Sequence, residues 1–505
     1  MKKRVIIVGL DGATWDIIDK FIDRLPNIKR IINSGCRGTL ISAIPCVTAS
    51  AWPSAFTGVN PGKHGGFGFF KYTKTYEKIP TNSSDIKYPY LWELLSKKGL
   101  KTISVAVPLT YPVKKINGIM ISGFTTPGTD CDFTYPKELK SKILRQFPNY
   151  HVDPPHAFEA NPTEYRQDIF DIAEQNSELT KMLLKEIPDW DLFITVFSST
   201  DWIQHYYLDE PDSLFRVYST IDKFLAWFFE NVYDENTTII LMSDHGFEEK
   251  TRVVNINRLL EEKGYLKTKK SATKSILAST GGLRSSLKKF DIFNLRRIMP
   301  YSIKEQIPTK KYDVVSIDLE KSAAWFPSTG GRGVFVKDKS LVDDLASLLS
   351  SLKDPKTNQN IFTHVWKRQD IYEGPYTEMA PDLLLHPKTG YEIVETYHNE
   401  WIIDVIWPDR IGTHNEKGII AAMGGQVSNK KLDMYIWDIA TTVLVLLGLP
   451  LYYDMDGEFK RDLFKENSDF YSKKAQYIPN VKTVAKKAIH LRKSRKKEQS
   501  PGNKI

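Results

Sequence analysis

Seven side chains able to bind a divalent cation lie far apart in this sequence, each just after an apolar β-like run or at a turn. They are Asp11, Thr48, Asp201, His205, Asp244, His245 and His414. Three carboxylates, three imidazoles and one hydroxyl combine hard oxygen with borderline nitrogen ligands. That set suits Zn²⁺ or Mn²⁺ better than an iron–sulfur cluster or a Ca²⁺ cage. Together the seven residues can hold two metal ions, and such a pair supports chemistry on phosphate esters.

Thr48 is the candidate nucleophile of this set. It precedes a short run rich in small residues, so its hydroxyl can lie at the N-terminus of a helix, where free backbone N–H groups and the dipole favour phosphate. A bound cation would lower the pKa of the hydroxyl and allow it to attack phosphorus in line. Taken alone, a threonine in this position is more often an N-cap than a nucleophile.

The acid and imidazole pairs also have two interpretations. Asp201 and His205 are spaced i, i+4, which places both on one face of a helical turn where they can share a cation. Taken alone, a capping Asp followed one turn later by a polar His is the more ordinary interpretation. Asp244 and His245 end an apolar strand, and burying such a pair without a partner is costly, which favours a cation. His414 follows a glycine, Gly412, and is expected in a loop.

A largely parallel sheet would bring these residues together. Apolar β-rich runs alternate with helical patterns at Tyr90–Lys98 and Thr163–Glu186; the runs are Arg4–Leu10, Leu100–Val107, Ile119–Ser122, Leu192–Phe197 and Thr237–Met242. This alternation predicts an α/β fold in which helices cover both faces of the sheet. Ligands of such sheets gather at the carboxyl ends of the strands, where Asp11, Asp201 and Asp244 fall.

The composition is that of a soluble globular protein of 505 residues with 41% hydrophobic content. The apolar run Val5–Leu10 is too short for a signal peptide, so it is expected to be the first core strand of an unprocessed chain. The longest apolar stretch, Ile439–Pro450, is shorter than the roughly 20 residues of a membrane span, and predicts a buried helix ending at Gly448. Three cysteines in so long a chain argue against a disulfide framework, and we expect a cytoplasmic protein.

The distribution of charge and the local amino-acid composition divide the chain into four parts. Residues 1–257 are predicted as the first part of the core, and residues 258–312 as a basic helical insertion or cap. Residues 313–470 are predicted as the second part of the core, with strands at Gly333–Val336 and Asp382–Leu385. Residues 471–505 are predicted as a disordered basic tail. After Pro479 the tail has nine basic residues and one acidic one, a net +8 of the chain's +9. Such a tail is either a solvated terminus or attracted to an anionic membrane or nucleic acid.

The motifs, in their order, resemble the alkaline phosphatase superfamily, and within it the type I phosphodiesterase and nucleotide pyrophosphatase branch. The resemblance runs from Arg4 to about Leu463. It is carried by Val8-Gly-Leu-Asp-Gly12, Thr57-Gly-x-x-Pro-Gly-x-His-Gly65, Ser243-Asp-His-Gly246, Ala380-Pro-Asp-Leu383, Gly412-Thr-His414, Asp438-Ile-Ala-Thr-Thr-Val-Leu444 and Met455-Asp-Gly457. It implies an alkaline phosphatase-like α/β/α sandwich of three layers with an inserted cap or arm.

The resemblance also implies roles for the seven residues. One metal ion would bind to Asp11, Thr48, Asp244 and His245, and the other to Asp201, His205 and His414, with Zn²⁺ favoured over Mn²⁺. Thr48 would attack a small phosphorylated substrate, such as a nucleotide sugar or another diester or pyrophosphate, and form a phosphothreonine that water then releases. No equivalent of the phosphoryl-binding asparagine common in this branch is placed in Gly65–Lys74.

Other readings stay open. A phosphomutase of the same superfamily would return the phosphoryl group to its substrate. A basic protein without catalytic activity could use its tail and insertion on a membrane surface or on nucleic acid. A sulfatase is disfavoured, because Cys46-Val-Thr-Ala-Ser50 lacks the Pro and Arg that must follow a modifiable Cys or Ser.

Overall fold

The computed structural model describes residues 3–73, 75–269, 316–395, 399–405 and 410–479. Its centre is a sheet of nine strands in the order β22-β2-β21-β9-β1-β8-β5-β6-β7. The bounds are β1 Arg4–Leu10, β2 Cys36–Ile41, β5 Thr102–Val107, β6 Gly118–Ser122, β7 Thr134–Tyr135, β8 Leu192–Phe197, β9 Thr237–Met242, β21 Lys417–Met423 and β22 Met434–Tyr435. The strands from β9 to β6 are parallel, whereas β21 runs antiparallel to both of its neighbours.

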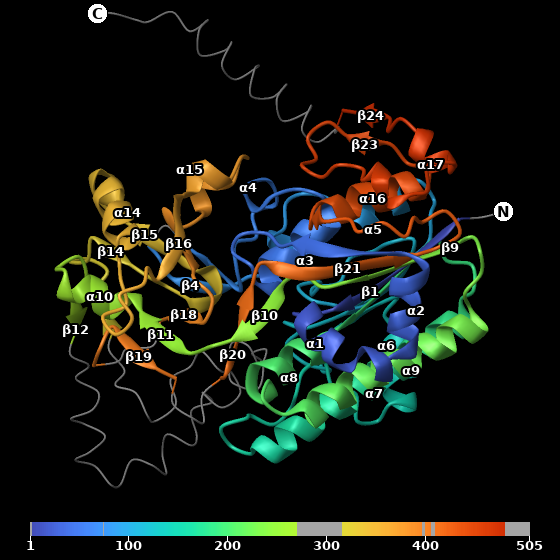
Figure 1. Ribbon diagram of the computed structural model, residues 1–505, viewed down its shortest axis with the longest axis horizontal. Coiled ribbons are helices and arrows are strands. Elements are labelled where there is room, and N and C mark those ends of the chain that lie inside the picture. Colours follow the sequence, from blue (N-terminus) through green and yellow to red (C-terminus); the bar gives the residue numbers. More distant parts are fainter. Residues whose placement is uncertain (1–2, 74, 270–315, 396–398, 406–409, 480–505) are drawn as a thin grey trace, which may run out of the picture.

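Helices cover both faces of this sheet, because its central strands are apolar on both sides. On β1, Ile6 and Val8 belong to the core on one face, and Val5 and Ile7 to the core on the other. The first face is covered by α1 Trp15–Phe21, α2 Pro26–Ser34, α7 Pro162–Glu186, α8 Ser199–Tyr207 and α9 Pro211–Asn231, and the second by α3 Thr48–Thr57, α5 Leu91–Ser96 and α16 Asp438–Leu446 (Figure 1). The predicted α/β fold with a mostly parallel central sheet is therefore confirmed.

A second lobe lies beside the large sheet, at the left of Figure 1. It contains the sheets β14-β15-β17-β16 and β18-β11-β19 and has a hydrophobic core of its own. Its elements are β11 Arg252–Asn255, α10 Ile256–Glu262, β12 Thr268–Lys269, β13 Ser316–Ile317, β14 Ala324–Trp325, β15 Gly333–Val336, α14 Val342–Ser350, β16 Phe362–Lys367, α15 Arg368–Ile371, β17 Leu383–Pro387, β18 Tyr391–Val394 and β19 Ile402–Asp404.

The chain returns to the large sheet later than the predicted start of the second core part at residue 313. The strands at 333–336 and 383–387 exist as predicted, but they pair within the second lobe, and the chain rejoins the nine-stranded sheet only at β21. These strands bury their apolar residues against α10 and α14 instead of the central strands. Most of the predicted basic insertion, and the tail beyond residue 479, lie outside the described residues.

A two-stranded ribbon connects the two lobes. Strand β10 (Gly246–Glu249) leads out of the large sheet, and β20 (Gly412–Asn415) leads back into it, pairing antiparallel with β10 so that Phe247 faces His414. The remaining short elements are α4 Pro61–His64, β3 Phe70–Tyr72, β4 Lys78–Pro80, α6 Glu138–Gln146, β23 Leu451–Tyr452, α17 Asp469–Ser472 and β24 Tyr477–Ile478. Within the described ranges, no helix is both long and apolar enough to cross a membrane.

Candidate metal centre

Three adjacent parallel strands position the acidic side chains of the site. Asp11 follows β1, Asp244 follows β9 after one intervening residue, and Asp201 lies in the first turn of α8, which follows β8. Because β1 is hydrogen-bonded to both β8 and β9, the three carboxyl groups meet at the carboxyl edge of the sheet. All three residues are buried, with at most 6% of their surface exposed.

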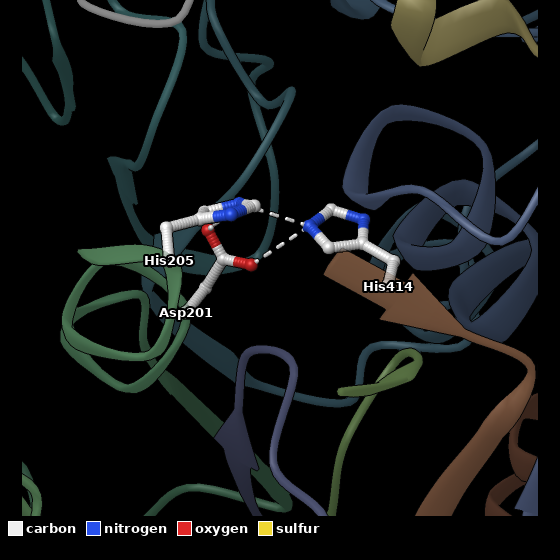
Figure 2. A group of neighbouring side chains, drawn as sticks. All are labelled: Asp201, His205 and His414. Carbon is white, nitrogen blue, oxygen red and sulfur yellow. Dashed lines mark hydrogen bonds and ion pairs between the residues drawn. The ribbon is translucent and has the colours of Figure 1, made fainter. Parts of the chain in front are cut away.

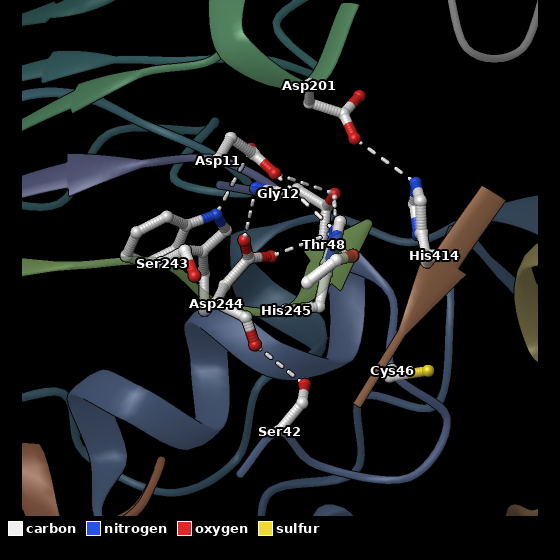
Figure 3. A network of polar contacts seen from close by, with 12 residues as sticks. Asp11, Gly12, Ser42, Cys46, Thr48, Asp201, Ser243, Asp244, His245 and His414 are labelled. Carbon is white, nitrogen blue, oxygen red and sulfur yellow. Dashed lines mark hydrogen bonds and ion pairs between the residues drawn. The ribbon is translucent and has the colours of Figure 1, made fainter. Parts of the chain in front are cut away.

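The first ligand group consists of Asp11, Asp244 and His245, and Thr48 lies against it (Figure 3). Thr48 begins α3, and its Oγ1 is 3.3 Å from Asp11 Oδ1 and 3.4 Å from His245 Nε2. His245 Nε2 is also 3.4 Å from Asp244 Oδ2 and 3.6 Å from Asp11 Oδ1. The four side chains therefore turn their polar atoms toward one point.

The second ligand group consists of Asp201, His205 and His414 (Figure 2). His414 Nε2 is 3.1 Å from Asp201 Oδ1 and 3.0 Å from His205 Nε2, and the i, i+4 pair on α8 is joined at 3.5 Å. The rings of His245 and His414 stack with their centroids 3.8 Å apart, so the two groups are adjacent. The structure thus brings together all seven residues selected from the sequence.

The expectation of a loop at His414 was wrong, because this residue lies on strand β20. Its partner strand β10 follows directly after His245, and the pairing of Phe247 with His414 sets the position of the imidazole in the second group. A four-residue strand of this kind depends on its distant partner rather than on local sequence.

Backbone carbonyls orient two of the imidazoles. His245 Nδ1 is 3.1 Å from the carbonyl oxygen of Gly246, and His205 Nδ1 is 3.2 Å from that of Gly412. In a neutral ring each Nδ1–H donates to the carbonyl, which leaves the lone pair of Nε2 directed into the site. The 3.0 Å approach of two Nε2 atoms, His205 to His414, fits a cation between the rings better than two adjacent lone pairs.

Burial dominates the electrostatics of the site. Desolvation, reinforced by the Asp244 and Asp201 carboxylates, raises the pKa of Asp11 well above its usual range. Burial likewise raises the pKa of Asp244 to about 7 and that of Asp201 to about 6. Burial holds the pKa of all three histidines well below the ordinary value, so the rings are neutral and able to act as ligands at neutral pH.

The protein's own hydrogen bonds do not satisfy these carboxylates. Asp244 Oδ2 is buried without a hydrogen-bond partner, and Asp201 Oδ1 also receives no hydrogen bond although His414 Nε2 is close. Three buried carboxylates, two of them with an unsatisfied oxygen, are expensive unless a cation neutralises them. The chemistry of the donor set therefore fits two divalent ions.

Gly12 keeps space open between the two groups. Its φ is +66°, in the left-handed region that favours glycine, and an added Cβ would lie 3.2 Å from both Asp201 Oδ1 and His245 Cε1. The Gly12 N–H donates to Asp244 Oδ1 at 3.2 Å. A side chain at this position would enter the space between the ligands.

Several supporting residues were missed from the sequence. Trp52 Nε1 donates to Asp11 Oδ2 at 3.2 Å, Thr200 Oγ1 to the Asp11 carbonyl at 2.7 Å, and Ser42 Oγ to the Asp244 carbonyl at 2.6 Å. Trp52 lies four residues after Thr48, and this helical spacing was a usable signal. Arg332 was also missed: it comes from the second lobe and donates to Cys46 Sγ and to the His414 carbonyl.

Comparison with known proteins agrees with this geometry. Residues 5–419 match the family described as type I phosphodiesterase / nucleotide pyrophosphatase. The chain belongs to this family. It is therefore an enzyme of the phosphodiesterase and nucleotide pyrophosphatase type, as the sequence motifs predicted. No curated protein matches the chain significantly by sequence.

Solved structures of the superfamily share the fold at low identity. Murine ectonucleotide pyrophosphatase / phosphodiesterase 5 is 14% identical, with 92% of this chain and 100% of that chain covered and a TM-score of 0.53. Phosphonoacetate hydrolase from Sinorhizobium meliloti 1021 is 16% identical, with 88% and 96% covered and a TM-score of 0.59. The alkaline phosphatase PafA is 14% identical, with 92% and 99% covered and a TM-score of 0.55. These similarities establish the fold.

Proposed function

We propose that the chain is a two-metal phosphoesterase that hydrolyses phosphodiester or pyrophosphate bonds through a covalent phosphothreonine at Thr48. The observation that carries the proposal is the position of Thr48 Oγ1, which lies at the start of α3 within 3.4 Å of both Asp11 and His245. Membership of the family supports a phosphoester substrate.

In this proposal Asp11, Thr48, Asp244 and His245 hold one ion, and Asp201, His205 and His414 hold the other. The ions, Zn²⁺ by preference or Mn²⁺, would supply Lewis acidity toward the Thr48 hydroxyl, the phosphoryl oxygens and a water molecule. Thr48 is 98% buried at a helix N-terminus, a position that favours a phosphoryl group because the first N–H groups of a helix have no partner within it.

Two displacements follow from this arrangement. The Thr48 oxygen forms a bond to phosphorus and the bond to the leaving-group oxygen breaks, so the leaving group departs with a proton. Water then bonds to phosphorus, the bond to Thr48 breaks, and the hydroxyl regains its proton. Trp52 and the Gly12 N–H would hold Asp11 and Asp244 in position throughout, through the hydrogen bonds that they donate.

The substrate is proposed to be a small phosphorylated molecule such as a nucleotide sugar or another diester or pyrophosphate. Structures of the superfamily with AMP and with phosphonoacetate support a small phosphorus-containing ligand. A phosphomutase would share the first displacement, and product analysis distinguishes it, since a mutase returns the phosphoryl group to its substrate as an isomeric ester, whereas a hydrolase transfers it to water. The two buried ligand groups favour an enzyme over a protein that only binds a partner. A cytoplasmic location and contact of the tail with an anionic membrane stay predictions.

The decisive experiment compares Thr48→Ala and Thr48→Ser with the unaltered chain, each loaded with Zn²⁺ or Mn²⁺, on bis(4-nitrophenyl) phosphate. We expect Thr48→Ala to lower kcat by roughly 10³-fold or more, because the nucleophile is lost. Thr48→Ser should keep measurable turnover, and both variants should keep their metal by elemental analysis. Full activity of Thr48→Ala would remove Thr48 as the nucleophile.

A further inference from the structure

Arg332 differs from the other buried cations of this protein. Among the described residues, three Lys or Arg residues are at most 6% exposed: Lys250, Arg332 and Arg368. Lys250 pairs with Glu392 at 2.8 Å, and Arg368 pairs with Asp382 and Glu378. Arg332 has no carboxylate partner among the described residues. A buried charge without a counter-ion is strongly destabilising, so this guanidinium calls for an anion that the described residues do not supply.

The guanidinium lies at the edge of the candidate metal centre. Its Nη1 donates to Cys46 Sγ at 3.0 Å, and its Nη2 donates to the carbonyl oxygen of His414 at 2.8 Å. Cys46 is two residues before Thr48, and His414 belongs to the second ligand group. These two contacts use only two of the five N–H groups of an arginine, and the planar fork suits phosphate oxygens.

The loop that carries Arg332 is held firmly. Arg332 adopts φ +42°, which is unfavourable for a residue with a side chain and is kept only where the surroundings demand it. Its carbonyl accepts from the Leu385 N–H at 2.8 Å, and the preceding Gly330 packs against Phe69 of the large lobe. The second lobe therefore delivers a fixed guanidinium to a site that the large sheet builds.

We propose that Arg332 binds anionic oxygens of the substrate beyond those neutralised by the metal ions, and so favours substrates with more negative charge than a simple diester. The extra oxygen has two chemical sources: the second ionised oxygen of a monoester, or a phosphate next to the attacked phosphoryl group in a pyrophosphate. The proposal rests on the proposed function of the metal centre, and identifies Arg332 as a substrate-binding residue that sets specificity.

Binding measurements test this without turnover. In the zinc-loaded full chain carrying Thr48→Ala, orthophosphate, pyrophosphate and bis(4-nitrophenyl) phosphate are titrated by calorimetry, with and without Arg332→Ala. We expect Arg332→Ala to weaken pyrophosphate binding by roughly 10- to 100-fold, as for the loss of charge-assisted hydrogen bonds, and to leave the diester within about threefold. If Arg332→Ala weakens orthophosphate binding as much as pyrophosphate binding, Arg332 contacts the attacked phosphoryl group. If orthophosphate binding does not change, Arg332 contacts the neighbouring phosphate.

Matched variants separate this role from a purely structural one. Arg332→Lys keeps the charge without the fork and should lose less affinity than Arg332→Ala. Gly331→Ala changes the same loop, but its Cβ would meet nothing within 4 Å, so anion binding should not change. If Arg332→Ala weakens the binding of all three ligands equally, or of none, Arg332 only makes a structural contact between the lobes and the proposal is overturned. Failure of the unaltered zinc protein to hydrolyse any phosphoester would instead refute the proposed function, while these affinities still decide the role of Arg332.

Discussion

Asp244 shows how burial changes the ionisation of a carboxyl group in the candidate metal centre. Its carboxyl group is fully buried beside Asp11 and Asp201, and burial raises its pKa to about 7. In the unfolded chain the pKa of an aspartate is near the model-peptide value of about 3.9. The folded form therefore holds its proton more tightly, and this group's contribution to stability is present below about pH 4 and is lost as the pH rises through 7.

Removing this ionisable group should therefore stabilise the metal-free protein at alkaline pH. With EDTA present at pH 8, we expect Asp244→Asn to unfold at a higher urea concentration than the unaltered chain. Its free energy of unfolding should be greater by about 1–4 kcal/mol, at 1.36 kcal/mol per pKa unit. The difference should vanish well below pH 4, where Asp244 is protonated in both the folded and the unfolded state. The exposed Asp16→Asn is the control, and a metal-free Asp244→Asn protein less stable than the unaltered chain at pH 8 would contradict the assignment.

At the level of elements, the site depends on the contact of helix α3 with the end of strand β1. Trp52 of α3 is fully buried, stacks on Phe56, and donates its indole N–H to Asp11. The helix that presents Thr48 thus also orients a carboxylate of the first ligand group. Loss of that hydrogen bond should disturb the metal site more than the core.

Substitutions at two positions of α3 separate these effects. Trp52→Phe removes the hydrogen bond but keeps an aromatic ring, and we expect metal affinity to fall by roughly 10-fold, within the range found when an outer hydrogen bond to a ligand is removed. Phe56→Leu reduces packing on the same helix without touching Asp11, and should lower the urea midpoint while leaving metal affinity unchanged. Competition with a fluorescent zinc chelator measures both. Equal metal affinities for Trp52→Phe and Phe56→Leu would show that the indole N–H has no role.

The sequence predicted the elements whose signal is local. Strands β8 and β9 were predicted with the bounds that the structure has, because each is a β-rich run of mostly apolar residues with nearly every position buried. Their adjacency to β1 explains why Asp11, Asp201 and Asp244 could be expected at one edge. Strand β20 was missed because it exists only through pairing with β10, and Arg332 because its burial depends on a loop from another lobe. The metal-binding roles of the seven residues stay predictions.

On the scale of the whole molecule, charge is concentrated in the last residues of the chain. Nine basic residues and one acidic one follow Pro479, in a segment that lies outside the described residues. Near an anionic bilayer each Lys or Arg contributes roughly 1 kcal/mol of attraction, which weakens as salt screens the surface.

Truncation after Asn480 should therefore reduce binding to liposomes that contain anionic lipid at low salt, and leave phosphoesterase turnover unchanged. Co-sedimentation with anionic and with neutral vesicles measures the effect, and neutral vesicles should bind neither form. If the truncated and full-length chains sediment equally with anionic vesicles, the tail is only a solvated terminus.

The ribbon of β10 and β20 has a consequence for how this enzyme can change. The chain enters the second lobe through β10 and leaves it through β20. His245 directly precedes β10, and His414 lies within β20. The lobe can thus be exchanged as a unit, with graft points after residue 250 and before residue 411, while every candidate metal ligand stays within the retained part of the chain. Such a chimera would keep the candidate metal centre of one parent and, because Arg332 would be replaced, would show whether the second lobe sets the choice of substrate.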